Sequence, residues 1–325
     1  MSVAPRIVSL LPSASEMVCA LGLGDQLVGV THECDYPAMA RSKPAVVRNA
    51  LALETMSQGE IDAAVTARLR DGLSLYELDT DLIEALSPDL IITQSLCDVC
   101  APSGNDIAAL LRHLTKTPEV LWMTPHSLAE IDDNLRDLGR ATGRLRRAER
   151  LIARGRARLE AVEAATSSIG RHPRVFCMEW LDPVYCCGHW VPEMVRIAGG
   201  SDALGRLGRD SVRVGWDEVL DWAPEVLVVM PCGYDLDASL QRTPALTDRP
   251  GFRDLPAARD GRVYVVDANS YFARPGPRVV DGVELMAHLI HPDRFGWSGP
   301  VDAYRRLGAR VNEASPRLQA DAHAG

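Results

Sequence analysis

The sequence has 325 residues, of which 46% are apolar, enough for about two domains with a buried core in each. A net charge of -9 and a pI near 5.4, without a basic patch interleaved with aromatic residues, argue against a nucleic-acid or anionic-membrane partner. Lys43 and Lys116 are the only lysines, so we set aside enzymes that use a lysine nucleophile.

The first residues run directly into a strand-like segment, 6–11, without the positively charged region and apolar stretch of a signal peptide. No apolar run approaches the length of a membrane-spanning helix. Eight cysteines would be hazardous in an oxidising compartment unless all of them were paired. From these features we expect a cytoplasmic protein without membrane insertion.

The first part of the chain alternates short apolar strands with helices. Ser13 and Glu16 have the spacing of a capping box at the start of a helix, and Ser103 is a second candidate N-cap. Residues 90–93 are continuously apolar, as in a strand buried on both faces of a parallel sheet. The pattern predicts strands at 7–11, 27–31, 90–93 and 120–123, and helices at 13–21, 59–70, 81–86 and 107–114.

Residues 127–170 form the only long segment with sustained helical character. Ser127 and Glu130 are placed as a capping box, and residues 145–165 are almost free of glycine, proline and β-branched residues. Those 21 residues would span about 30 Å as a helix, the width of a small domain. We interpret 127–170 as a rigid strut between two lobes, residues 1–126 and 171–325. The alternative is an ordinary surface helix of one larger domain.

The same alternation returns after this segment. Strands are expected at 174–179, 226–230 and 263–266, and helices at 192–197 and 278–290. Strands that alternate with helices predict two Rossmann-like α/β lobes with mainly parallel sheets. Ligands of such sheets bind outside the carboxyl ends of the strands. The cysteine, histidine and aromatic residues that follow the predicted strands should therefore line one cleft between the lobes.

Four cysteines fall in these loops. Cys97 and Cys100 form a C-x-x-C pair after the predicted strand 90–93, and Cys34 and Cys232 occupy corresponding loops. Four thiolates satisfy a tetrahedral zinc ion or one iron–sulfur cubane, and three would leave a coordination position open for chemistry. The alternative is a set of free thiols in a reducing compartment.

Several segments carry a resemblance to a known family. They are residues 5–16, 27–31 with 35–37, 88–92 and 271–278. Over most of residues 5–293 the chain resembles the class III substrate-binding proteins with a helical backbone, and among these the cobalamin-binding branch. Siderophore and haem binders share this scaffold.

The resemblance implies a ligand site and a docking site. Aromatic side chains from both lobes would press on a flat macrocycle, with Trp216, Tyr271 and Phe272 as the candidates here. Acids on each lobe, Asp81 and Asp217 or Glu218, lie near the positions where transporter-coupled relatives meet a permease. Together with the other residues at the strand ends, the predicted ligand contacts are His32, Trp180, His189, Trp190, Trp216, Tyr271, Phe272 and Arg274.

We therefore expect a cytoplasmic binding protein that holds a corrinoid such as cobalamin between its lobes, without catalytic turnover. Without export, a permease partner is not expected. The alternative is a metal or iron–sulfur protein, enzymes included, with a zinc or cluster site at Cys34, Cys97, Cys100 and Cys232 in the same cleft.

Overall fold

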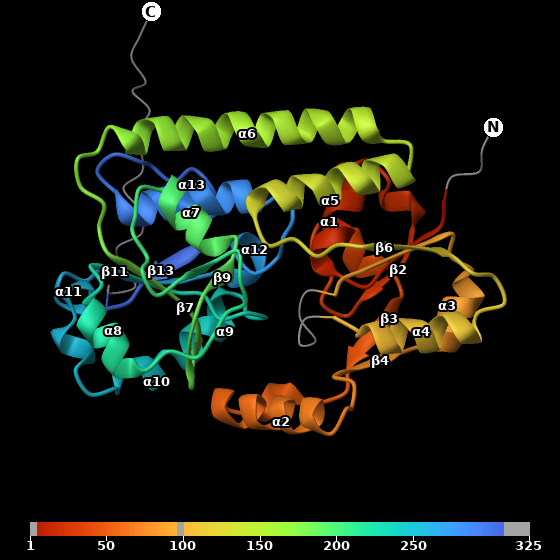
Figure 1. The fold of residues 1–325 in the computed structure, drawn as a ribbon, viewed down its shortest axis with the longest axis horizontal. Helices are drawn as coiled ribbons and strands as arrows, with labels where there is room; N and C mark the ends of the chain where they lie inside the picture. Colours follow the sequence, from red (N-terminus) through yellow and green to blue (C-terminus); the bar gives the residue numbers. More distant parts are fainter. Residues whose placement is uncertain (1–4, 96–100, 309–325) are drawn as a thin grey trace, which may run out of the picture.

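The computed structural model describes residues 5–95 and 101–308 (Figure 1). An N-terminal and a C-terminal α/β lobe lie side by side, and a long helix, α6, crosses above both. The predicted fold class, two α/β lobes joined by a long connecting helix, is confirmed.

The N-terminal lobe is built on a six-stranded sheet with the order β4-β3-β2-β1-β5-β6. All neighbouring strands are parallel except β3 and β4. The strands are β1 (Ile7–Ser9), β2 (Leu27–Thr31), β3 (Ala45–Asn49), β4 (Tyr76–Leu78), β5 (Leu90–Thr93) and β6 (Glu119–Trp122). The helices are α1 (Pro12–Ala20), α2 (Gln58–Arg70), α3 (Thr80–Leu86) and α4 (Gly104–His113).

The C-terminal lobe has a five-stranded sheet with the order β13-β12-β11-β7-β8, in which the two outer strands are antiparallel to their neighbours. Its strands are β7 (Val175–Leu181), β8 (Val184–Cys186), β11 (Val226–Val229), β12 (Val263–Val266) and β13 (Tyr304–Arg306), with a separate pair β9 (Gly188–His189) and β10 (Arg206–Leu207). Its helices are α7 (Val191–Ile197), α8 (Trp216–Trp222), α9 (Leu236–Arg242), α10 (Pro244–Thr247), α11 (Pro256–Arg259), α12 (Ala268–Tyr271) and α13 (Val279–Ile290).

The connecting segment is a pair of helices, α5 (Leu128–Ala141) and α6 (Leu145–Ser167). Gly143, with φ of 67°, supplies the left-handed turn between them. Gly139 lets the helices pack closely, because a Cβ there would lie 2.9 Å from the Cβ of Ala148. At about 1.5 Å per residue, the 23 residues of α6 extend roughly 35 Å, long enough to reach both lobes.

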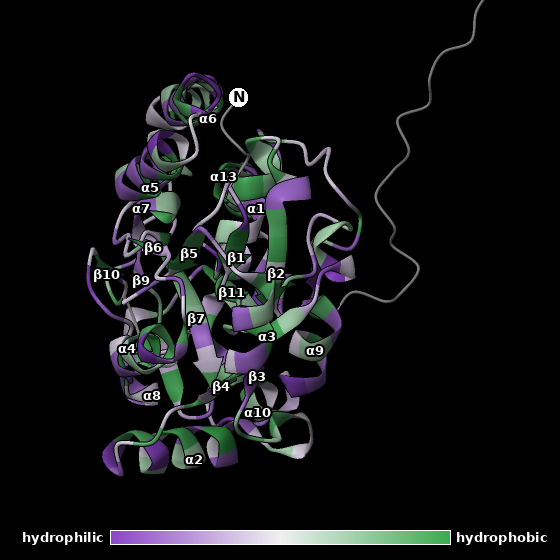
Figure 2. Ribbon diagram, turned by 90° about the vertical axis from the view of Figure 1, so that its right-hand side faces the viewer, coloured by the Kyte–Doolittle hydropathy of each residue, from purple (hydrophilic) through white to green (hydrophobic). Residues whose placement is uncertain are grey.

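The apolar core continues from one lobe into the other on the α6 side. One cluster of buried residues includes side chains of β1 and α1, of α5 and α6, and of α7, α13 and β11. Two further clusters belong to the C-terminal and the N-terminal lobe respectively. Figure 2 shows apolar residues on the inner strands and polar residues on the outer turns of α5 and α6.

Most of the predicted elements are present, with two kinds of difference. The sequence pattern did not predict β3, β4 or β8, which are only three to five residues long. The predicted capping box of α1 is wrong: the N-cap is Leu11, which makes no side-chain cap, and Pro12 begins the helix. The Glu16 carboxylate does not cap α1 but forms an ion pair with Arg278 of the C-terminal lobe.

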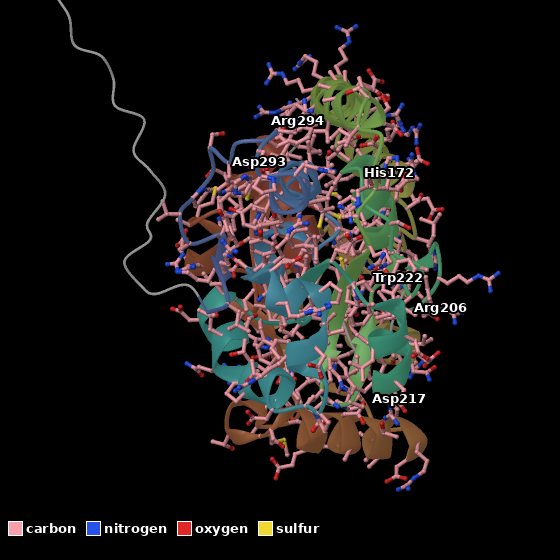
Figure 3. All side chains as sticks on the ribbon, turned by 90° about the vertical axis from the view of Figure 1, so that its left-hand side faces the viewer. His172, Arg206, Asp217, Trp222, Asp293 and Arg294 are labelled. Atoms are coloured by element: carbon pink, nitrogen blue, oxygen red, sulfur yellow. The ribbon has the colours of Figure 1, made fainter. Side chains whose placement is uncertain are left out.

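Helix α2 lies at the edge of the molecule opposite α6 (Figures 1 and 3). Ser57 caps it in a reciprocal capping box with Glu60. Although α2 belongs to the N-terminal lobe, it extends to the C-terminal lobe and contacts β7 and β8 through side chains. The two lobes are thus in contact at both edges.

Candidate functional site

The loops at the carboxyl ends of strands from the two lobes meet at the lobe junction. The loop after β2 contacts the segment after α12, and α1, which follows β1, contacts the start of α13. In parallel sheets these ends form the ligand-binding edge, so the junction is the candidate site.

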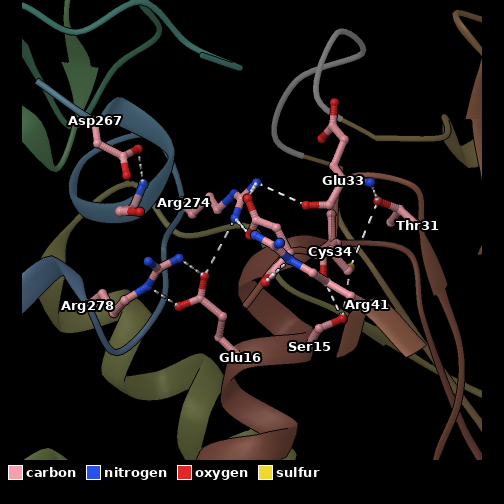
Figure 4. A network of polar contacts seen from close by, with 12 residues as sticks. Ser15, Glu16, Thr31, Glu33, Cys34, Arg41, Asp267, Arg274 and Arg278 are labelled. Atoms are coloured by element: carbon pink, nitrogen blue, oxygen red, sulfur yellow. Dashed lines mark hydrogen bonds and ion pairs between the residues drawn. The ribbon is translucent and has the colours of Figure 1, made fainter. Parts of the chain in front are cut away.

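A cluster of charged residues, here called the ion cluster, joins the lobes on the strut side (Figure 4). The Nε of Arg278 donates to Oε2 of Glu16 at 2.9 Å, and its Nη2 donates to Oε1 at 2.6 Å. The Glu16 side chain is only 3% exposed. The Arg278 guanidinium also lies 4.2 Å from the ring centroid of Tyr36, a cation–π contact.

Arg274 completes the ion cluster. It pairs with the carboxylate of Asp35, and its Nη2 donates to the carbonyl oxygen of Glu33 at 3.0 Å. Burial raises the pKa of Glu16, and the two nearby arginines only partly offset this effect. Arg274, predicted as a ligand contact, therefore makes contacts between the lobes, and sequence spacing gave no sign of its partners.

A second contact, here called the α2 contact, joins the lobes at the opposite edge. The carbonyl oxygen of Gln58 accepts a hydrogen bond from Nε1 of Trp180 at 3.3 Å, and its Oε1 accepts from the Leu181 amide at 3.2 Å. Asp62 accepts from the Tyr185 hydroxyl at 3.2 Å and from Nη2 of Arg213 at 2.6 Å. Among the described residues, none of the buried apolar clusters joins α2 to the C-terminal lobe.

A stack of rings lies at the ends of β7 and β11 in the C-terminal lobe. Trp180 and Tyr234 stack with ring centroids 5.5 Å apart and planes 19° apart. The Arg242 guanidinium lies 4.5 Å from the Tyr234 ring centroid. Trp180 and Tyr234 are partly exposed, so this stack offers an aromatic surface beside the α2 contact.

Three other predicted ligand contacts are core residues. Phe272 and Trp190 are 1% and 4% exposed, and Nε1 of Trp190 donates to the Phe272 carbonyl oxygen at 2.9 Å. Tyr271 packs edge-on against Trp297, with ring centroids 5.8 Å apart. These residues, which were predicted as ligand contacts, are packed in the core instead: α13 lies so close to α12 that a Cβ at Gly282 would be 2.2 Å from the Tyr271 carbonyl oxygen.

The remaining predicted contacts have other partners. Trp216 donates from Nε1 to the Pro250 carbonyl oxygen at 2.7 Å and is contacted by Arg249. His32 is exposed, with Nδ1 3.0 Å from the Val47 carbonyl oxygen. His189 is largely buried, and this burial lowers its pKa.

The structure describes two of the four cysteines of the predicted metal site. Cys34 is buried, with Sγ 3.1 Å from Oγ of Ser15, and burial raises the pKa of its thiol, which favours the protonated form. Cys232 is a partly exposed free thiol. Cys97 and Cys100 lie outside the described residues, so the four-thiolate zinc or iron–sulfur site stays a prediction.

A cavity of about 670 Å³ lies on the strut side of the ion cluster. It is lined by residues of α1, α5, α6 and α13, and Glu16, Tyr36 and Arg278 contribute to its wall. The ion cluster therefore borders this cavity. In the part of the chain that the structure describes, no helix is both long and apolar enough to cross a membrane.

The profile of the periplasmic binding protein family matches residues 7–270, and the chain therefore belongs to this family. A protein of Bacillus subtilis (strain 168) named as an uncharacterized ABC transporter substrate-binding lipoprotein is 26% identical over 298 residues, which cover 89% of this chain and 81% of the relative.

Two solved structures share the fold. The periplasmic vitamin B12-binding protein BtuF of Vibrio cholerae has a TM-score of 0.64 at 24% identity, and the match covers 89% of this chain and 97% of that one. A periplasmic heme-binding protein from Pseudomonas aeruginosa has a TM-score of 0.70 at 23% identity, with coverages of 94% and 100%. The chain thus shares the two-lobed fold of these proteins.

These relatives contradict the predicted cytoplasmic location, because they are named as a lipoprotein or as periplasmic proteins. The cysteine content misled that prediction: four free cysteines, Cys34, Cys177, Cys186 and Cys187, are buried, and burial protects a thiol in an oxidising compartment. The Bacillus relative, named as part of an ABC transporter, also speaks against the expectation that a permease partner is absent.

Proposed function

We propose that this protein binds a flat macrocycle, most specifically a corrinoid, between its two lobes and passes it to an ABC transporter permease. The family membership supports ligand binding, and a relative with the same fold is named as a vitamin B12-binding protein. The main support for the proposal is that the loops at the carboxyl ends of strands from both lobes meet at one junction.

The ring stack is the proposed macrocycle contact. The Trp180 and Tyr234 rings lie where β7 and β11 end, and the partly exposed Trp180 ring provides apolar area for a planar ligand. A buried aromatic contact of this kind contributes about 1–3 kcal/mol to binding. The α2 contact, which holds Trp180 through Gln58, would set the position of this ring.

The proposed permease contacts are acids on both lobes. Asp81 is in the first turn of α3, with a side chain that is 92% exposed. Asp217, labelled in Figure 3, is exposed in the first turn of α8. Exposed carboxylates on separate lobes can form ion pairs with arginines of a partner. Both carboxylates can pair at once only when the lobes are correctly spaced.

The test is equilibrium titration of the purified full chain with cyanocobalamin and, separately, with hemin, followed by ligand absorbance and tryptophan fluorescence. Saturable one-to-one binding of cobalamin that is tighter than that of hemin is expected. Binding of hemin alone would overturn the corrinoid assignment, and binding of neither would overturn macrocycle binding.

Two tryptophan variants locate the site. Trp180→Ala should weaken cobalamin binding by about 1–3 kcal/mol, which is about 5- to 150-fold, because the ligand loses stacking area. Trp222→Ala is the matched control: Trp222, also partly buried, donates to the carbonyl oxygen of Val175 at the opposite end of β7. Equal losses in both variants would remove Trp180 from the site.

A further inference from the structure

Two histidines and an aspartate gather on a part of the lobe junction that the proposed macrocycle site does not use. They are His126, between β6 and α5, His189, in β9, and Asp210, after β10. One ligand atom from each lies within 4.8 Å of the other two. Within the described ranges 5–95 and 101–308, this is the group whose side chains converge in a way that suits a metal ion.

The backbone of His189 is held in an unusual conformation. Its φ is 52°, a left-handed value that is uncommon for a residue with a side chain. The His189 amide donates to the carbonyl oxygen of Arg209 at 2.7 Å, and its own carbonyl oxygen accepts from Gly208 at 2.9 Å. The short strands β9 and β10 thus fix the ring, whose side chain is 15% exposed, beside Asp210.

The spacing of two of the groups matches that of ligands around one ion. Nε2 of His189 lies 3.2 Å from Oδ1 of Asp210. Around tetrahedral zinc, with bonds of about 2.0–2.2 Å, neighbouring ligand atoms lie roughly 3.3–3.5 Å apart. Binding an ion between these atoms would therefore require almost no movement of either side chain.

A carboxylate lies beside one ring nitrogen of the third ligand, His126. Oε2 of Glu130 accepts the His126 amide at 2.7 Å and lies 3.4 Å from Nδ1 of the same residue. A carboxylate at one ring nitrogen fixes the tautomer and leaves the other nitrogen free to bind a metal, an arrangement found around most metal-binding histidines. The His126 and His189 ring centroids are 5.7 Å apart, and the ring planes are tilted by 47°.

We propose that His126, His189 and Asp210 form a site for a divalent transition metal, best suited to zinc, that joins the two lobes. The donor set of two imidazoles and a carboxylate fits zinc, and three protein ligands leave a fourth position for water. His126 immediately precedes the strut, whereas His189 and Asp210 belong to the C-terminal lobe.

A bound ion would thus tie the C-terminal lobe to the start of α5. The same region already carries one direct contact, a 3.0 Å hydrogen bond from the Leu128 amide to the Glu193 carboxylate. The metal would add a stronger connection to this one. The proposal does not depend on which macrocycle the protein binds, because none of the three ligands belongs to the ring stack.

The experiment is calorimetric titration of the reduced full chain with Zn²⁺ alone, together with absorption spectroscopy of the Co²⁺ form. We expect one ion per chain and a Co²⁺ spectrum without a sulfur-to-metal charge-transfer band. His126→Ala and His189→Asn should each abolish this binding. Glu130→Gln, which changes a positioning residue, should weaken it by about 10–100-fold.

His113→Ala is the matched control, because His113 also lies 3.2 Å from an aspartate, Asp81, but no third ligand joins this pair among the residues that the structure describes. It should bind zinc as the unchanged protein does. Zinc should also raise the melting temperature of the unchanged protein and not that of His126→Ala. Unchanged zinc binding in His126→Ala, which alters a partly exposed side chain, or a thiolate band in the Co²⁺ spectrum would overturn the proposal.

Discussion

The two contacts between the lobes differ in burial and in chemistry. In the ion cluster, Glu16 is 3% exposed and forms a two-point pair with Arg278, which is 15% exposed. In the α2 contact, the Asp62 and Arg213 side chains are 18% and 55% exposed, and water competes for their pairing.

Their surroundings differ in the same way. The ion cluster adjoins the apolar core that runs from one lobe through α5 and α6 into the other, whereas polar hydrogen bonds and ion pairs hold the α2 contact. Opening the first would expose a buried charge and apolar surface, but opening the second would expose groups that water can satisfy. We infer that the lobes are fixed at the strut edge and can separate at the α2 edge.

The largest expected effect comes from breaking the ion cluster. Arg278→Met should lower the free energy of unfolding by about 3 kcal/mol at pH 7.5, because it removes the two-point partner of the buried Glu16 carboxylate and leaves only Arg274, at 3.9 Å. Denaturant unfolding at a series of pH values measures the loss. Arg140→Met, which removes an exposed pair with Asp137 on α5, should cost no more than about 0.5 kcal/mol and serves as the control.

The loss should depend on pH in a definite direction. Burial already raises the folded-state pKa of Glu16 above its unfolded value, and removing Arg278 should raise it further. A carboxyl group with a raised folded-state pKa destabilises the protein increasingly as pH rises from the unfolded pKa through the folded one. The cost of Arg278→Met should therefore be smaller at pH 4.5 than at pH 7.5, and an equal cost at both would contradict this account.

Local sequence patterns predicted the elements that local interactions determine. The strand at 90–93 coincides with β5, and the run that is almost free of glycine and proline coincides with α6. Each is determined by the residue pattern within one segment. Strand β4 was missed because it is a three-residue edge strand whose residues are partly exposed or exposed. Its position depends on pairing with β3, which spacing within one segment does not encode.

The sequence predicted that the candidate site lies between the lobes, but not which side chains are exposed there. Tyr271 follows β12 as predicted, whereas Trp180 lies within β7, near its end. Trp180 is partly exposed, but α13 packs against α12 and Tyr271 is buried. The role of Glu16 was misjudged because its partner, Arg278, lies 262 residues away. The sequence could have offered one hint: Arg274 and Arg278 both follow a predicted strand and require acidic partners if buried.

The next effect should come from the buried part of the α2 contact. Gln58→Ala removes the acceptor of the Leu181 amide, and Leu181 is fully buried, so the free energy of unfolding should fall by about 1–2 kcal/mol. Hydrogen exchange should accelerate in α2 and β7 but not in α6. Gln241→Ala, at an exposed position of α9, is the control and should change neither quantity.

The smallest effect on stability should come from the exposed pair. Asp62→Asn weakens the attraction to Arg213 while keeping the shape of the side chain, so the free energy of unfolding should fall by less than about 1 kcal/mol. High salt should reproduce the effect in the unchanged protein and add nothing in the variant, because the pair is screened.

This variant should also report where the lobes separate. Faster hydrogen exchange is expected in α2, with an unchanged solution scattering curve, since α6 and the ion cluster keep the lobes in place. For the same reason, ligand binding should slow exchange in α2 and leave the scattering curve of the unchanged protein nearly the same. A large contraction on ligand addition, or faster exchange in α6 rather than α2, would show that the strut edge is where the lobes move.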